Sequence, residues 1–116
     1  METKKFTVEG RIWITTSNEN SIGNGKIQLL EMIHKLGSLR QASLEMKMSY
    51  QQAWNMINNL NKQFEKPLVL LRRGGKDGGK AEITDYGLKV MQTFYDLLSE
   101  FANFKETQNS RLNFKF

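Results

Sequence analysis

The stretch that decides the fold is residues 49–64, SYQQAWNMINNLNKQF. Four apolar side chains recur in it at helical spacing: Ala53, Ile57, Leu60 and Phe64. Intervals of four, three and four place such side chains on one face of an α-helix. Ser49 is a typical N-cap residue, and Pro67 prevents the helix from continuing. The sequence therefore predicts a helix over about residues 49–64 with one buried face.

Two more helices are predicted directly before this one. The first opens at Gly23-Asn24-Gly25, ends at Gly37, and carries one apolar face: Leu29, Leu30, Ile33 and Leu36. Ser38 is placed to cap a short second helix over Leu39–Met46. Still earlier, residues 6–15 are predicted to form a strand, because apolar residues recur at even spacing: Phe6, Val8, Ile12 and Ile14.

The second half of the sequence is predicted to form a hairpin and a long helix. Leu68–Arg73 and Ala81–Thr84 are short strand-like stretches joined by a glycine-rich turn, Gly74–Lys80. Thr84 then caps a helix with a wide apolar face: Leu88, Met91, Phe94, Tyr95, Leu98, Phe101 and Ala102. We expect a mainly α fold with a small β-hairpin wing, a winged helix-turn-helix with a long C-terminal helix. Residues 1–104 form the expected domain, and residues 105–116 a polar, possibly disordered tail.

Composition excludes several classes of protein. A chain of 116 residues without cysteine has room for one domain and cannot form disulfides, thiolate nucleophiles or cysteine-ligated zinc. No apolar run is long enough to span a bilayer, and no signal-like segment follows the N-terminus, so a cytoplasmic location is expected. His34 is the single histidine and no acid–base pair stands out. We therefore expect neither an enzyme nor a metal or other cofactor.

The positive charge is localised. The formal net charge is +5, and residues 23–83 account for it with ten Lys or Arg against five Asp or Glu. The flanking segments, 1–22 and 84–116, are each balanced. A polyanion selects such a local positive surface, since each neutralised phosphate releases condensed counterions.

The outward side of helix 49–64 is the predicted base-reading surface. Its residues are nearly all amides: Gln51, Gln52, Asn55, Asn58, Asn59 and Lys62. A carboxamide presents a donor beside an acceptor, which matches the adenine edge in the major groove. Ser49 and Tyr50 lie at the helix N-terminus, where free N–H groups attract phosphate. An inert amide-rich face is the alternative interpretation.

The hairpin is the predicted backbone-contacting surface. Its cations surround four glycines: Arg72, Arg73, Lys76 and Lys80. A basic loop without a partner is an equally good interpretation of this segment alone. It also nearly matches a nucleotide-binding P-loop, but Ala81 lacks the hydroxyl that would ligate magnesium, and no helix follows.

The spacing of apolar residues in the last helix predicts a dimer. Four of its apolar residues follow the three–four–three spacing of a helix seam: Met91, Phe94, Leu98 and Phe101. The alternative is that the domain's own core covers this face. Trp13, on the opposite side of the first strand from Ile12 and Ile14, is free to cover a second surface or a partner, whereas Trp54 is expected in the core.

Four motifs together resemble the N-terminal domain of the ModE family of molybdate-responsive transcriptional regulators. They are Gly37-Ser38-Leu39, Ser49-Tyr50 with Ala53-Trp54, the run 72–79 (RRGGKDGG), and Ile83-Thr84-Asp85-Tyr86-Gly87. The resemblance covers roughly Gly10 to Phe104. It implies a winged-helix dimer on operator DNA, with residues 49–62 in the recognition helix and 72–80 in the wing.

The sequence departs from the family pattern in two places. Lys47 occupies a turn position usually held by glycine, so either a non-glycine residue is left-handed there or the turn differs. Full-length members carry C-terminal oxyanion-binding domains, but about a dozen residues follow the last predicted helix here, so an oxyanion effector is not expected from this chain. We predict a duplex-DNA-binding transcriptional regulator; the alternative is a protein-interaction module using the last helix and Trp13.

Overall fold

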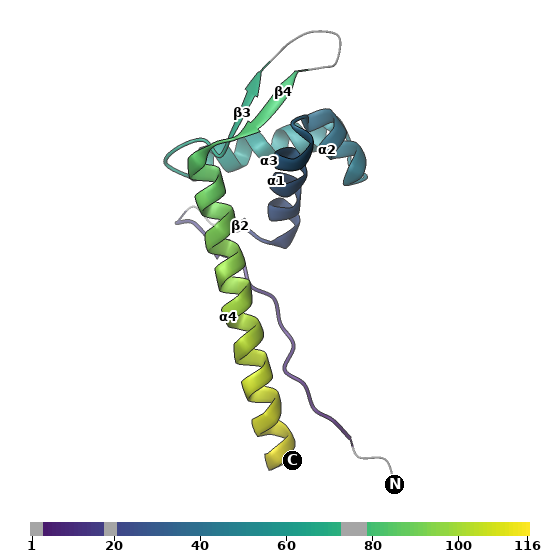
Figure 1. Ribbon diagram of the computed structural model, residues 1–116, viewed down its shortest axis with the longest axis vertical. Helices are drawn as coiled ribbons and strands as arrows, with labels where there is room; N and C mark the ends of the chain where they lie inside the picture. Colours follow the sequence, from purple (N-terminus) through teal and green to yellow (C-terminus); the bar gives the residue numbers. More distant parts are fainter. Residues whose placement is uncertain (1–3, 18–20, 73–78) are drawn as a thin grey trace.

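The computed structural model describes residues 4–17, 21–72 and 79–116. The elements follow the order β1 (Ile14–Thr15), β2 (Ser21–Ile22), α1 (Asn24–Leu36), α2 (Leu39–Glu45), α3 (Tyr50–Gln63), β3 (Val69–Arg72), β4 (Lys80–Ile83) and α4 (Asp85–Lys115). Helices α1, α2 and α3 and the β3–β4 hairpin form a compact head, from which α4 extends as a stalk (Figure 1). This is the predicted winged helix-turn-helix, with its long C-terminal helix.

The caps lie where the sequence predicts them. Gly37 ends α1 in a left-handed conformation with φ 67°. The hydroxyls of Ser38, Ser49 and Thr84 accept hydrogen bonds from backbone N–H groups in the first turns of α2, α3 and α4. Each cap satisfies a donor that the helix itself leaves free, so these boundaries are fixed by local chemistry.

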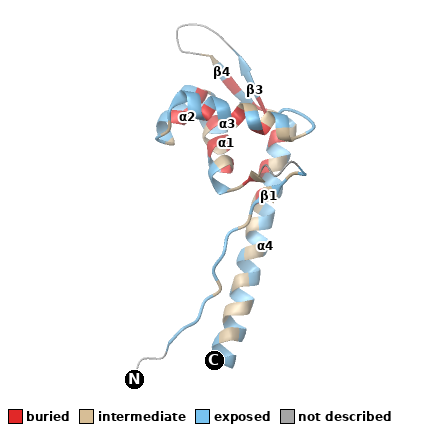
Figure 2. Ribbon diagram, turned by 180° about the vertical axis from the view of Figure 1, so that it is seen from behind, coloured by how far each residue is buried: buried red, intermediate tan, exposed pale blue. Residues whose placement is uncertain are grey.

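The core is confined to the head. Its buried side chains come from all three short helices, the hairpin and the first part of α4: Leu29, Leu30, Ile33, Ala42, Ile57, Leu60, Leu68 and Phe94 are each 0% exposed, and Val69 is 1% exposed. Ala53 is also buried and Phe64 packs against this cluster, as predicted for the inward side of α3. Buried residues crowd the head, whereas the distal half of α4 is intermediate or exposed (Figure 2).

The predicted core position of Trp54 is wrong, because its side chain is 39% exposed. Leu36, predicted on the apolar face of the first helix, is 36% exposed and is not part of the core either. Both lie at the edge of an apolar stripe, where the helical period alone cannot decide between core and surface.

The predicted strand over residues 6–15 is mostly not a strand. Only Ile14–Thr15 pairs, antiparallel with Ser21–Ile22. Residues 6–13 instead run alongside α4, where the N–H of Phe6 donates to Asn113 Oδ1 at 2.9 Å and the N–H of Val8 to Asn109 Oδ1 at 2.5 Å. Val8, Ile12 and Ile14 are still less exposed than their neighbours, so the alternation is real.

Helix α4 is longer than predicted. It runs to Lys115, and residues 105–115 continue it where a polar, possibly disordered tail was expected. The asparagines at 109 and 113 are one turn apart on this extension, and both bond the N-terminal segment. No described helix is long and apolar enough to cross a membrane.

Candidate nucleic-acid interface

The amide-rich side of α3 faces solvent. Five of its six predicted residues are exposed, namely Gln51, Gln52, Asn55, Asn59 and Lys62, and Asn58 is half-buried. The inward residues Ala53, Ile57 and Leu60 fix the helix from the opposite side, each 0% exposed. The amides therefore project from a rigidly packed helix.

Two of the predicted residues are already bonded to each other at the start of α3. Ser49 Oγ accepts from Gln52 N–H at 3.0 Å, and Gln52 Oε1 accepts from Ser49 N–H at 3.0 Å, forming a capping box. Farther along the helix, Gln51 Nε2 donates to Asn55 Oδ1 at 3.1 Å. The exposed residues of this face that the cap does not occupy are consequently Gln51, Asn55, Asn59 and Lys62.

Arg40 was missed by the sequence reasoning. It lies on α2, and its guanidinium carbon is 5.8 Å from the centroid of the Tyr50 ring, within cation–π range. Tyr50 is 47% exposed at the N-terminus of α3. The pair adds a cation beside the helix end, but nothing in the spacing of residues 40 and 50 signals that the turn brings them together.

The described part of the wing carries two facing cations. In the antiparallel register Arg72 is directly opposite Lys80. Like charges in this position repel, and the exposed Arg72–Glu82 pair, with its nearest atoms 3.8 Å apart, offsets little of that repulsion. Arg73 and Lys76, the other predicted wing cations, lie outside the described residues, as do Asp77 and all the turn glycines except Gly79.

The hairpin is attached to the helices through hydrogen bonds on both strands. Asn61, on α3, accepts from Leu68 N–H at 2.8 Å and Val69 N–H at 3.1 Å, and donates to Val69 O at 2.9 Å. On the other strand, Ala81 N–H donates to Gly37 O at 3.1 Å. The wing therefore lies beside α3, as predicted, although the sequence reasoning did not single out Asn61.

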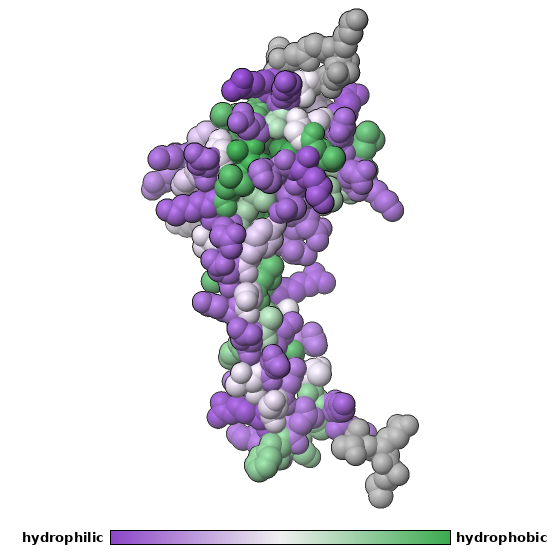
Figure 3. Space-filling view, viewed as in Figure 1, coloured by the Kyte–Doolittle hydropathy of each residue, from purple (hydrophilic) through white to green (hydrophobic). Residues whose placement is uncertain are grey.

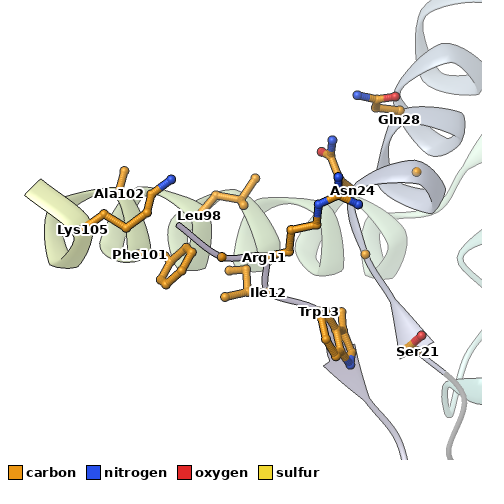
Figure 4. Close-up of a pocket in the computed structure, with 13 residues that line it drawn as sticks. Arg11, Ile12, Trp13, Ser21, Asn24, Gln28, Leu98, Phe101, Ala102 and Lys105 are labelled. Carbon is orange, nitrogen blue, oxygen red and sulfur yellow. The ribbon is translucent and has the colours of Figure 1, made fainter. Parts of the chain in front are cut away.

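The predicted dimer surface needs correction. Met91 and Phe94 are 4% and 0% exposed in the single chain, so they belong to its core and have little surface left for a partner. Leu98 and Phe101 are half-buried and line a cavity of about 800 Å³ between α4, the N-terminal segment and the start of α1. Trp13 and Arg11 line the same cavity (Figure 4).

A hydrogen bond joins the stalk to the head. The Tyr95 hydroxyl, on α4, donates to Glu31 Oε2, on α1. Burial, the hydrogen bond and the neighbouring negative charge together raise the pKa of Tyr95 to about 12. Among the described residues, no cluster of His, Cys, Asp or Glu could hold a metal ion.

The sequence is similar to curated ModE proteins. The Azotobacter vinelandii molybdenum transport protein ModE is 31% identical over 103 residues, which are 89% of this chain and 38% of that protein. The Escherichia coli K12 DNA-binding transcriptional dual regulator ModE is 41% identical over 75 residues, 65% of this chain and 28% of that protein. The resemblance to the ModE regulators is confirmed.

The match is confined to part of these regulators. The chain spans 38% or less of the length of the ModE proteins described above. The Rhodobacter capsulatus molybdenum-pterin-binding protein MopA shows the same limit, at 38% identity over 63% of this chain and 28% of its own length. No family model matches the chain.

Solved structures show the same fold. The Staphylococcus aureus regulator MepR superposes with a TM-score of 0.61 at 16% identity, over 75% of this chain and 65% of its own. A MepR variant bound to an oligodeoxyribonucleotide gives 0.57 at 15% identity, over 81% and 75%. At these identities the likeness establishes the winged-helix fold.

Proposed function

We propose that this chain is a sequence-specific duplex-DNA-binding transcriptional regulator of the ModE type, which reads the major groove with α3 and contacts the backbone with its wing. The observation that carries the proposal is the exposed amide face of α3 beside a hairpin with two opposed cations. The similarity to ModE proteins that are DNA-binding transcriptional regulators supports it.

Base reading is assigned to the amides that the capping box leaves available. Gln51, Asn55 and Asn59 are exposed and follow one another at about one turn each along the same helix. Their side chains can offer the paired donor and acceptor that adenine N7 and N6 require. Because the opposite face of α3 is packed into the core, these amides project from a rigid scaffold, as direct readout of bases requires.

Backbone contact is assigned to the wing and to the N-terminus of α3. The repulsion between Arg72 and Lys80 is relieved if a phosphate lies between them, which favours an anionic partner over a vacant surface. Arg73 and Lys76 belong to the same hairpin in the sequence and are assigned the same role. Arg40 and Tyr50 add a second contact at the helix end.

Selection of bound duplexes from a random pool tests this function. The wild-type chain should enrich one motif, and the double variant Asn55→Ala, Asn59→Ala should bind DNA without enriching it. Asn103→Ala, which removes an exposed amide from the distal part of α4, is the matched control and should enrich the wild-type motif. Enrichment of an unaltered motif by the double variant would show that these amides do not read bases.

We further propose that the active form is a homodimer joined along α4 and the N-terminal segment. The radius of gyration is 18.2 Å, against about 13 Å for a compact domain of this length. The accessible surface is 8864 Å², against roughly 6,500 Å² for a compact monomer of this mass. The excess of roughly 2,300 Å² per chain is enough surface for a stable homodimer interface.

The exposed apolar residues identify where a partner would pack. About half of the exposed large apolar side chains among the described residues lie on the stalk and the segment beside it: Phe6, Trp13, Leu97, Phe104, Phe114 and Phe116. The others are distributed over the helices, the hairpin and the start of α4 in the head. Apolar surface is visible at several heights along the stalk (Figure 3). We therefore expect these exposed residues in the interface in place of Met91 and Phe94, which are buried in the head. The half-buried Leu98 and Phe101 remain part of the expected interface.

Sedimentation equilibrium tests the dimer. The wild-type chain should sediment as a dimer, and Phe104→Glu should shift it toward monomer. Leu44→Glu places the same charge on an exposed apolar position of α2, in the head, and should leave the dimer intact. A monomeric wild-type chain would contradict the homodimer and favour a different protein as the partner of this surface.

A further inference from the structure

We propose that Asn61 is a positioning residue: it fixes the wing relative to the recognition helix, so that wing–phosphate and helix–base contacts form together. The inference rests on the proposed DNA-binding function and adds to it the residue that couples its two contact surfaces. The carrying observation is the pair of strand-like hydrogen bonds between the Asn61 side chain and Val69, with a third from Leu68.

The side-chain amide of Asn61 makes the hydrogen bonds that a neighbouring strand would otherwise make at the base of the wing. Its oxygen accepts from two consecutive N–H groups, and its NH₂ group donates to Val69 O, so both ends of the carboxamide are satisfied. Leu68 and Val69 are 0% and 1% exposed. Because these backbone groups are buried, removing the amide leaves them without a partner, and the strand must shift to reach water.

A small shift at Val69 becomes large at the wing cations. Arg72 is three residues farther along β3, about 10 Å away at the rise of an extended strand. A tilt of about 15° at the base therefore displaces Arg72 by roughly 2–3 Å, more than a hydrogen bond to phosphate tolerates. The other strand is held by the bond from Ala81 to Gly37, which a change at residue 61 does not touch. Loss of Asn61 should accordingly rotate the hairpin while leaving it folded.

The salt dependence of DNA binding measures this effect. Each lost phosphate contact flattens the plot of log K against log salt by about 0.9. The calibrating variant Arg72→Ala, Lys80→Ala should flatten it by about 0.9 on the selected duplex, because the two cations share one phosphate. Asn61→Leu, which keeps the volume and loses the amide, should flatten it comparably, and it should still enrich the wild-type motif because α3 itself is unchanged.

The control separates positioning from stability. Ile57→Val lowers the stability of α3 from within the core but leaves the Asn61 hydrogen bonds in place, so it should retain the wild-type slope. Should Asn61→Leu fail to fold, Asn61→Ser removes the same paired bonds with a smaller polar side chain and should flatten the slope likewise.

Two outcomes overturn the inference, and they are distinguishable. If the calibrating variant flattens the slope and the folded Asn61 variant does not, the wing contacts DNA but Asn61 does not position it. If the calibrating variant leaves the slope unchanged, the wing makes no phosphate contact, and both the wing assignment and the role of Asn61 are wrong.

Discussion

Gly87, in the first turn of α4, lies directly against the main-chain carbonyl oxygen of Leu68, and a Cβ at this position would fall inside van der Waals contact with that oxygen. The same oxygen accepts from Thr84 N–H at 2.9 Å, so the carbonyl cannot move away freely. Gly87→Ala should therefore lower the free energy of unfolding by about 1–3 kcal/mol, the usual cost of overpacking. Urea denaturation followed by circular dichroism measures it.

Gly25 provides the matched control on another helix. A Cβ there meets nothing within 4 Å, and the residue lies in the first turn of α1. Gly25→Ala should raise the free energy of unfolding by roughly 0.5–1 kcal/mol, because alanine has less unfolded-state freedom to lose. Equal effects of the two substitutions would show that the contact at Leu68 is not what requires a glycine.

The elements that the sequence predicts well are those whose boundaries depend on neighbouring residues. Gly37, Ser38, Ser49 and Thr84 act on donors and acceptors within one helical turn, so their roles can be recognised without a structure. The outward side of α3 follows from the helical period for the same reason. The winged-helix order could thus be derived from local chemistry.

The errors arise where distant segments meet. Residues 6–13 have the alternation of a strand, but their hydrogen-bonding partners are asparagines more than a hundred residues away on α4. In the sequence, nothing distinguishes Asn61 from the other amides of α3. Its role is apparent only from its hydrogen bonds to the hairpin. Met91 and Phe94 fit a helix seam by spacing alone, and only the packed head shows that its own core takes them.

Tyr95 should make stability fall at alkaline pH. Its pKa is raised to about 12, above the unfolded value of 10.0, so the folded chain holds the phenolic proton more tightly than the unfolded chain does. The resulting stabilisation is fully present below pH 10 and is lost as the pH rises through about 12. In the Tyr95→Phe variant, the free energy of unfolding should fall less across this pH interval than it does in the wild-type chain. Denaturation at a series of pH values measures the difference. Identical pH profiles would contradict this assignment.

The chain should be more stable with glycine in place of Lys47. Its φ is 55°, so a side chain occupies the left-handed position that ends α2, where Met48 N–H donates to Ser43 O at 3.0 Å. Lys47→Gly should raise the free energy of unfolding by roughly 0.5–1 kcal/mol, the strain relief exceeding the added freedom of the unfolded chain. Lys47→Ala removes the same charge but keeps a Cβ, so it should give no such gain; a gain of equal size would attribute the effect to charge instead.

The N-terminal segment should depend on two asparagines of α4. Phe6 N–H and Val8 N–H donate to the side chains of Asn113 and Asn109, and Asn113 Nδ2 donates back to Phe6 O at 2.9 Å. Asn113→Ala should therefore speed amide hydrogen exchange at Phe6, and Asn109→Ala should speed it at Val8, because each amide loses its acceptor. Asn103→Ala, on the same helix, should leave both rates unchanged. If all three substitutions accelerated exchange equally, loosening of α4 as a whole would explain the result better than these hydrogen bonds.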